Sequence, residues 1–402
     1  MDSESHVSQI TPPKRIYLLL WLLVALVLYI FTSHLGTWAL WDAKVYAQAI
    51  HDWRSGQNPY NLSDPLLLFV YPPVFLCVGG FLARLLPGQT GWFLYIAIFV
   101  ASSVALPFVL ARFYLRRSWF SPAFAFVLAA MLPRFTGLMA LRTGNITNIF
   151  YLAALTAAIP GMRKNRWEYF YLAVFLIAMV KVNFLVMLLI PLLLGQRQWL
   201  QSVLCGLCVI GTYPLQKIFS PELFAGFQTA ASQQIAGHGA YGYGVMRIAV
   251  EIENAQHQAV GLTPYALQIV FVLVVMGAMF ALRWRQGDAA NRLWPALVLL
   301  ATILCNPRIL PYDADVALLA AFVVLVSALR TPRILLVAAV IFLPSVIIPY
   351  ALHTSMPGLY ETGVLLISFV AGYSMLWQRA ERPSPVEMMR TEATAGSLEA
   401  VS

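Results

Sequence analysis

Long apolar runs recur along the chain and limit what it can fold into. About thirteen can be distinguished, several of them near the 20 residues that a helix needs to cross a bilayer. They lie at 16–38, 66–86, 90–115, 118–133, 139–160, 167–180, 183–195, 199–219, 263–284, 293–310, 313–329, 333–350 and 358–377. Backbone groups in lipid must be paired within the protein, and these runs lack the alternation of a barrel strand. The sequence predicts an all-α, polytopic integral membrane protein whose shorter runs are half-helices or re-entrant.

Composition agrees with this class and argues against several functions. The 402 residues are 60% hydrophobic and only 11% charged, whereas a soluble domain carries about 25% charged residues. The net charge of +9 comes from basic residues in short loops, which membrane topology explains, so we expect no nucleic-acid partner. All four cysteines lie in apolar runs, and the C-x-x-C of Cys205 and Cys208 has no companion ligand pair. We therefore expect neither a metal site nor a cofactor.

One membrane domain accounts for most of the chain. We expect it to cover 16–377, between a cytoplasmic N-terminus at 1–15 and a cytoplasmic, disordered polar tail at 378–402. No small-residue cleavage site follows the first apolar run, which predicts a retained helix. Two polar segments, 39–65 and 220–262, are long enough to hold structure outside the membrane.

The distribution of basic residues predicts the orientation. Positively charged loops are expected to be cytoplasmic; they contain Lys14, Arg15, Arg163, Lys164, Arg166, Arg197, Arg283, Arg285, Arg292, Arg330 and Arg333. This places 39–65 and 220–262 outside and requires two short helices that meet at Lys181-Val182-Asn183. The cluster at 112–117 is external if 66–86 and 90–115 both span, and cytoplasmic if one of them is re-entrant. An external face reached without a cleaved signal suits a bacterial inner membrane.

The stretch WDAKVYAQAIHDWRSGQNPY, residues 41–60, interrupts the apolar pattern with charge. Asp42, Tyr46, Ala49 and Trp53 are spaced to share one helical face, and Gly56 is placed to end the helix. An amphipathic helix on the external surface is the expected structure. The Asp42 carboxylate can be an N-cap or a general base at the membrane surface, and the two roles are compatible.

A few polar residues, whose burial in a membrane costs free energy, interrupt the later apolar runs. They are Arg142, Asn145, Asn148, Lys181, Asn183, Arg308, Asp313 and Asp315. Such residues face a bundle interior or a wet cavity and mark sites, although lysine and arginine can instead extend to the interface. The predicted topology places several of them on the same face as Asp42. The histidines at 51, 238, 257 and 353 lack paired spacing, so we interpret them as polar loop residues and not as metal ligands.

The order of motifs resembles that of glycosyltransferase family 87. The motifs W-D-x-x-x-Y, W-R-S-G-Q-N-P-Y and F-V-Y-P-P-V-F are followed by R-T-G-N-I-T-N, K-V-N, Y-G-Y-G-V-M-R and N-P-R-I-L-P-Y-D-A-D. The resemblance covers most of the chain from residue 40 to about 320. The chain differs from the family pattern in having 312–315, YDAD, in place of a tryptophan followed by a histidine.

The resemblance implies a fold and a reaction. Members of this family are membrane mannosyl- and related transferases of the GT-C class, so it implies a bundle of about 11–13 transmembrane or re-entrant helices. A hexose, with mannose expected, would pass from a polyprenyl-phosphate donor to a lipid or glycan acceptor with inversion. Asp42 matches the general base, and Lys181, Arg247 and Arg308 are candidates for binding the donor phosphate. The substrate-binding candidates are Tyr46, Tyr60, Tyr71, Asn145, Asn183, Tyr312 and Asp313.

Two other functions share these sequence features. A transporter or flippase of lipid-linked saccharides would also have many helices and buried cations, but it predicts repeats or broken helices at mid-membrane. A family member without catalytic activity would serve as an assembly subunit.

Overall fold

The computed structural model describes residues 40–60, 68–86, 88–117, 119–131, 143–194, 198–238, 242–255, 261–286, 292–329, 337 and 359–381. The α-helices there are α2 (Trp41–Arg54), α3 (Pro73–Leu85), α4 (Gln89–Val109), α5 (Pro122–Met131), α7 (Thr147–Lys164), α8 (Glu168–Val180), α9 (Leu189–Leu193), α10 (Trp199–Phe219), α11 (Pro221–His238), α12 (Val245–Ala255), α13 (Thr263–Gln286), α14 (Trp294–Leu304), α15 (Pro311–Ala328) and α17 (Leu359–Glu381). A π-helix, η2 (Leu110–Tyr114), extends α4, and a 3-10 helix, η3 (Val182–Leu188), precedes α9. Within these residues the fold is all-helical, as predicted, and its only β-type contacts are isolated bridges from Gly242 and Tyr243 to Ile309.

The helices follow the predicted apolar runs closely. The run at 199–219 coincides with α10, and the run at 90–115 becomes α4 and η2. The predicted pair of short helices is also present, because Lys181 has φ −138° and ψ 89° and so interrupts the helix between α8 and η3. The run at 16–38, nearly all of 333–350 and most of the polar tail lie outside the described residues.

The core lies around α14 and α15. Residues Ala296–Leu304 of α14 and Val316–Val324 of α15 are almost entirely buried, so both helices are apolar on all sides. Helix α17 packs against both, and the Trp294 indole N–H donates a hydrogen bond to the Leu193 carbonyl at 3.0 Å. These contacts join the C-terminal helices to α9.

Several peripheral helices expose apolar side chains. Three segments are long and apolar enough to cross a membrane: Gln89–Tyr114, Trp199–Phe219 and Thr263–Arg285. Each exposes large apolar side chains, for example Phe93 at 62%, Phe219 at 81% and Leu273 at 66% of full exposure. Contiguous exposed apolar surface of this kind is rare on soluble proteins, so the three helices indicate association with a membrane.

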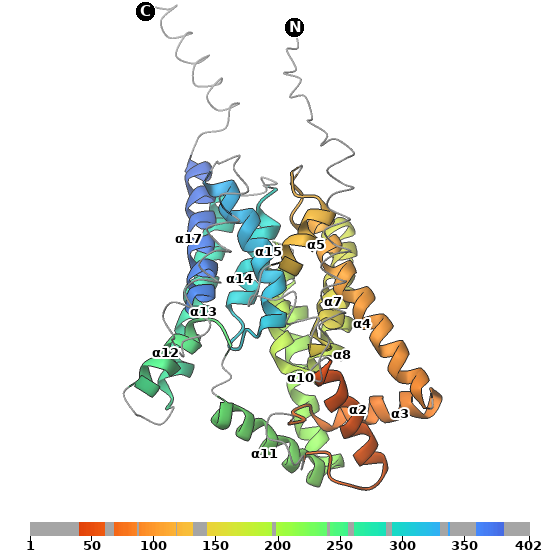
Figure 1. The fold of residues 1–402 in the computed structure, drawn as a ribbon. Coiled ribbons are helices and arrows are strands. Elements are labelled where there is room, and N and C mark those ends of the chain that lie inside the picture. Colours follow the sequence, from red (N-terminus) through yellow and green to blue (C-terminus); the bar gives the residue numbers. More distant parts are fainter. Residues whose placement is uncertain are drawn as a thin grey trace, which may run out of the picture.

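The two ends of the helix bundle differ (Figure 1). Helices α2, α3 and α11 lie across one end, which we call the α2 end, and α4 runs from α3 toward the other. The opposite end carries Arg112 and Arg116 beyond α4, together with Arg163 at the end of α7. Because α3 stays at the α2 end, the structure favours the alternative in which the 112–117 cluster lies on the same side as Arg163.

Candidate active site

Helix α2 carries Asp42 in its first turn. Leu40, with φ 57° and ψ 36°, occupies the N-cap position, and no side-chain hydrogen bond caps the helix. The N-cap interpretation of Asp42 is therefore wrong: Asp42 is the second helical residue, and its carboxylate has a distant partner. The helix ends as predicted, since Gly56 has φ 77° and the Gln57 N–H donates back to the Asp52 carbonyl at 2.8 Å.

Asn145 is the partner of Asp42. Its Nδ2 donates to Asp42 Oδ2 at 2.8 Å, while its Oδ1 accepts from the Thr147 backbone N–H at 3.0 Å. A backbone N–H can only donate, so this bond fixes Oδ1 and turns Nδ2 toward Asp42. Gly144 permits the close approach: its φ is 66°, and a Cβ there would lie 3.0 Å from a Leu40 side-chain atom and 3.2 Å from Ala43 Cβ.

Thr147 links this pair to Lys181. The Thr147 hydroxyl donates to Asn145 Oδ1 at 2.5 Å and accepts from Lys181 Nζ, also at 2.5 Å. Lys181 Nζ lies 4.5 Å from the centroid of the Tyr312 ring, a cation–π geometry. We call the contacts Asp42–Asn145–Thr147–Lys181 the Asp42 network. It joins a carboxylate and an ammonium group that are 139 residues apart in sequence.

Buried tyrosines support the network from the side of α2 and α3. Tyr46 Oη lies 2.8 Å from Tyr71 Oη, and Asn145 Nδ2 also approaches Tyr71 Oη at 3.5 Å. Tyr60 donates to the Tyr71 carbonyl at 2.9 Å, and Tyr95 donates to the Gly144 carbonyl at 2.6 Å. Tyr46, Tyr60 and Tyr71 are each less than 9% exposed. They hold α2 and the turn at Gly144 in place and leave little of their own surface for a substrate.

The surroundings of Asp42 raise its pKa. The side chain keeps a little exposed surface, but protein atoms displace water from its carboxyl group, and this desolvation raises the pKa from 3.8 to about 6. The Asn145 hydrogen bond and the positive charge of Lys181 oppose the rise, each by favouring the carboxylate. A carboxylate with a pKa near neutrality is suited to accept a proton.

Residues 306–313 approach the network from the C-terminal half. Tyr312 provides the ring under Lys181, whereas Asp313 is fully buried and starts α15: its Oδ2 accepts from the Leu310 N–H at 3.0 Å, and its Oδ1 accepts from Tyr151 Oη at 3.3 Å. The Arg308 guanidinium donates to Gln234 Oε1 on α11 at 2.9 Å. These contacts hold Asp313 at the N-terminus of α15, and Arg308 connects this segment to α11.

A glycine-rich turn fastens α12 to the same segment. Gly242 and Gly244 have φ of 67° and 110°, and the Tyr243 N–H donates to the Ile309 carbonyl at 2.6 Å. Gly244 N–H donates to Thr362 Oγ1 on α17 at 2.8 Å. Arg247 follows in the first turn of α12, so the turn sets its position.

Replacing Gly242 tests this attachment. A Cβ at Gly242 would lie 2.1 Å from the Ile309 carbonyl oxygen, so Gly242→Ala must displace backbone in addition to straining φ. We expect the free energy of unfolding to fall by more than about 2 kcal/mol. The left-handed conformation alone would cost about 1–2 kcal/mol. Gly56→Ala is the matched control, because Gly56 has φ 77° and no atom within 4 Å of its Cβ position. Equal shifts of the melting temperature for the two variants in detergent would contradict the attachment.

The predicted site residues are brought together only in part. Asp42, Asn145, Lys181 and Tyr312 form one continuous set of contacts, with Tyr71 beside it. Asn183, half-buried in η3, and Arg247 are not members of that set. Sequence reasoning missed Thr147, although Asn145-Ile146-Thr147 carries the signal of an Asx turn, in which an asparagine side chain accepts the N–H two residues on.

Metal ligands do not gather in the described ranges, where no three His, Cys, Asp or Glu side chains are grouped to hold an ion. Comparisons of the chain with protein-family models, curated proteins and solved structures found no match. The geometry of the Asp42 network and the sequence pattern therefore carry the functional argument.

Proposed function

We propose that the chain is a multi-pass membrane glycosyltransferase with its active site at the α2 end. It would move a hexose, mannose being the first choice, from a polyprenyl-phosphate donor to a hydroxyl group of a lipid or glycan acceptor. The observation that carries the proposal is the Asp42 network, in which Asn145 and Thr147 connect the Asp42 carboxylate, whose pKa is about 6, to the half-buried ammonium group of Lys181.

In the proposed chemistry, one end of the network accepts a proton and the other end stabilises negative charge. Asp42 takes the proton of the acceptor hydroxyl, whose oxygen attacks the anomeric carbon from the side opposite the phosphate. The bond from that carbon to the phosphate oxygen breaks with inversion, and polyprenyl phosphate leaves with an additional negative charge. Lys181 stabilises this charge, with Arg308 and Arg247 as further cations, because fixed charges in a site of low dielectric cost no reorganisation.

A lipid-linked donor suits the exterior of the molecule. Apolar side chains on α4, α10 and α13 face outward and are suited to contact hydrocarbon, while the network lies at one end of these helices. The donor tail would stay in the membrane while its sugar phosphate reaches Lys181. Arginines gather at the other end, which the positive-inside rule makes cytoplasmic, so we place the α2 end on the external face of a bacterial inner membrane.

The resemblance to glycosyltransferase family 87 supports the same assignment. Its motifs supply Asp42, Asn145 and Lys181, which are members of the Asp42 network, and Tyr312, whose ring contacts Lys181. These residues come from four separate sequence motifs and lie together in the fold, as residues of one site would. A transporter would also hold polar groups near a broken helix, as Lys181 does between α8 and η3, so only the product assay separates the two functions.

A product assay tests the proposal against both alternatives. The purified chain in nanodiscs receives a labelled polyprenyl-phosphate hexose and a mixed lipid acceptor fraction, and released polyprenyl phosphate is measured. We expect release together with transfer of the labelled hexose to an acceptor, with the configuration at the anomeric carbon of the hexose inverted. Movement of the donor across a vesicle membrane without bond cleavage would support a transporter, and neither release nor movement would support an assembly subunit.

A further inference from the structure

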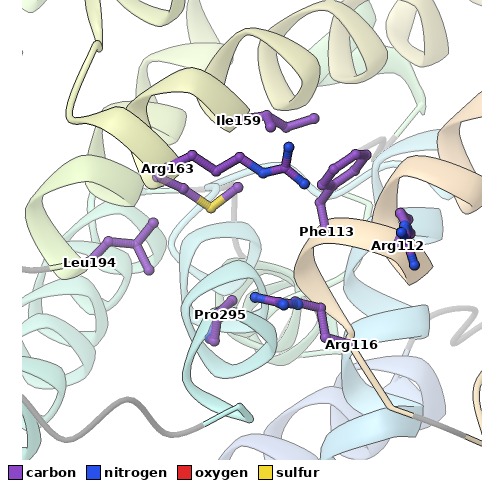
Figure 2. Close-up of a pocket in the computed structure, with 8 residues that line it drawn as sticks. Arg112, Phe113, Arg116, Ile159, Arg163, Leu194 and Pro295 are labelled. Atoms are coloured by element: carbon purple, nitrogen blue, oxygen red, sulfur yellow. The ribbon is translucent and has the colours of Figure 1, made fainter.

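A polar pocket lies at the end of the bundle opposite the Asp42 network (Figure 2). It has a volume of about 340 Å³ and is formed by η2, the end of α7, the end of α9 and the start of α14. Sixteen residues of α7 separate Thr147 from Arg163, which is roughly 24 Å along a helix at 1.5 Å per residue. The pocket is therefore separate from the proposed active site.

Three arginines line this pocket. Arg112 and Arg116 are four residues apart at the end of η2, and Arg163 faces them from α7. The Arg163 guanidinium lies 4.9 Å from the centroid of the Phe113 ring, which orients it. A π-helix at this point changes the register of the α4 side chains, and such turns are frequent at functional sites. We call Arg112, Arg116 and Arg163 the arginine triad.

Protein groups leave the charge of the triad uncompensated. Among the residues that the structure describes, no carboxylate pairs with any of the three guanidinium groups, and all three arginines are exposed to solvent. More positive charge lies nearby: burial lowers the pKa of Arg117, and the charges of Arg379 and Arg292 lower it further. Three like charges around one cavity repel one another, so a bound anion would stabilise the arrangement.

We propose that the arginine triad binds a phosphate group. A guanidinium presents a planar fork of donors that matches two phosphate oxygens, so arginine is favoured over lysine for this purpose. The group can belong to an anionic phospholipid headgroup, which basic pockets at the cytoplasmic ends of helices bind, or to a soluble phosphate compound. Phe113, Leu194 and Pro295 add apolar wall beside the arginines and are suited to the carbon atoms next to such a phosphate. The inference does not depend on the proposed glycosyltransferase activity.

Binding measurements on the full chain in neutral detergent test the proposal. One arm counts phosphatidylglycerol retained per chain by native mass spectrometry, with phosphatidylcholine as the reference lipid. The other arm measures equilibrium binding of labelled inorganic phosphate and its competition with the lipid. We expect saturable binding of one phosphate-bearing ligand. Competition by millimolar phosphate would indicate a soluble compound, and lipid binding without competition would indicate a headgroup.

Paired variants separate the pocket from general charge. Arg112→Gln/Arg116→Gln removes two charges that line the pocket, and Lys164→Gln/Arg166→Gln removes two charges that are equally exposed at the same end but lie outside the pocket. We expect the first pair to weaken binding by at least about tenfold and the second by less than about twofold. Arg112→Lys/Arg116→Lys keeps the positive charge but removes the planar guanidinium donors, so its binding should be intermediate. No saturable binding to the wild type, equal losses for the two glutamine pairs, or unchanged binding in the pocket pair would each overturn the proposal.

Discussion

Asp42→Asn is expected to lower hexose transfer by about 10²–10⁴-fold, which is the range for loss of a positioned general base. The substitution keeps the shape of the side chain, and the new amide oxygen can still accept from Asn145 Nδ2. It removes the ability to take a proton at neutral pH. Turnover of the polyprenyl-phosphate hexose by the purified chain in nanodiscs measures the effect.

A second aspartate on the same helix provides the control. Asp52 accepts from Gln48 Nε2 at 2.7 Å and is not part of the Asp42 network. Asp52→Asn should change transfer by less than about threefold, since an amide oxygen can replace the acceptor. Transfer by Asp42→Asn at the wild-type rate would remove Asp42 from the chemistry and leave it a structural residue.

Lys181→Met is expected to lower transfer by about 10²–10³-fold, as for removal of one preorganised group that stabilises transition-state charge. Methionine has a similar length and no charge, so packing against Tyr312 should be retained. A second readout follows from the site itself. The positive charge of Lys181 holds down the pKa of Asp42, so its loss should move the pH at which Asp42 ionises upward.

Lys217→Met is the matched control for this charge. Lys217 is exposed in the last turn of α10, so the same substitution there should leave transfer within about threefold of wild type. If Lys181→Met reduced transfer without moving the pH profile, the electrostatic link between Lys181 and Asp42 would be wrong. A loss of melting temperature equal to the loss of activity would indicate a folding defect instead.

The helices were predictable because their signal is local. A long apolar run favours a helix in a membrane without help from distant residues, so 199–219 and α10 coincide. The start of α3 could also have been predicted from the sequence. Pro72 and Pro73 prevent the helix from beginning earlier, so α3 contains only 13 residues of an apolar run that begins at 66. That shortening favours the arrangement in which Arg112 and Arg116 lie on the same side as Arg163, which the run length alone left open.

The contacts of the site were less predictable because they are long-range. The local pattern made Asp42 an N-cap, but a partner 103 residues away, Asn145, holds its carboxylate instead. Likewise the apolar run around Asp313 gave no indication that its carboxylate accepts a hydrogen bond from the Leu310 N–H at the start of α15. Sequence identifies which polar residues are expensive to bury, and only the folded arrangement indicates what each one contacts.

The pH dependence of kcat/KM for hexose transfer tests the central claim, the role of Asp42 as general base, most directly. The donor is a phosphodiester and stays anionic throughout, so the profile reports groups of the protein. A base acts in its deprotonated form, so the rate should rise about tenfold per pH unit below a midpoint of about 6 and level off above it. A rate independent of pH between 4.5 and 8 would contradict the account.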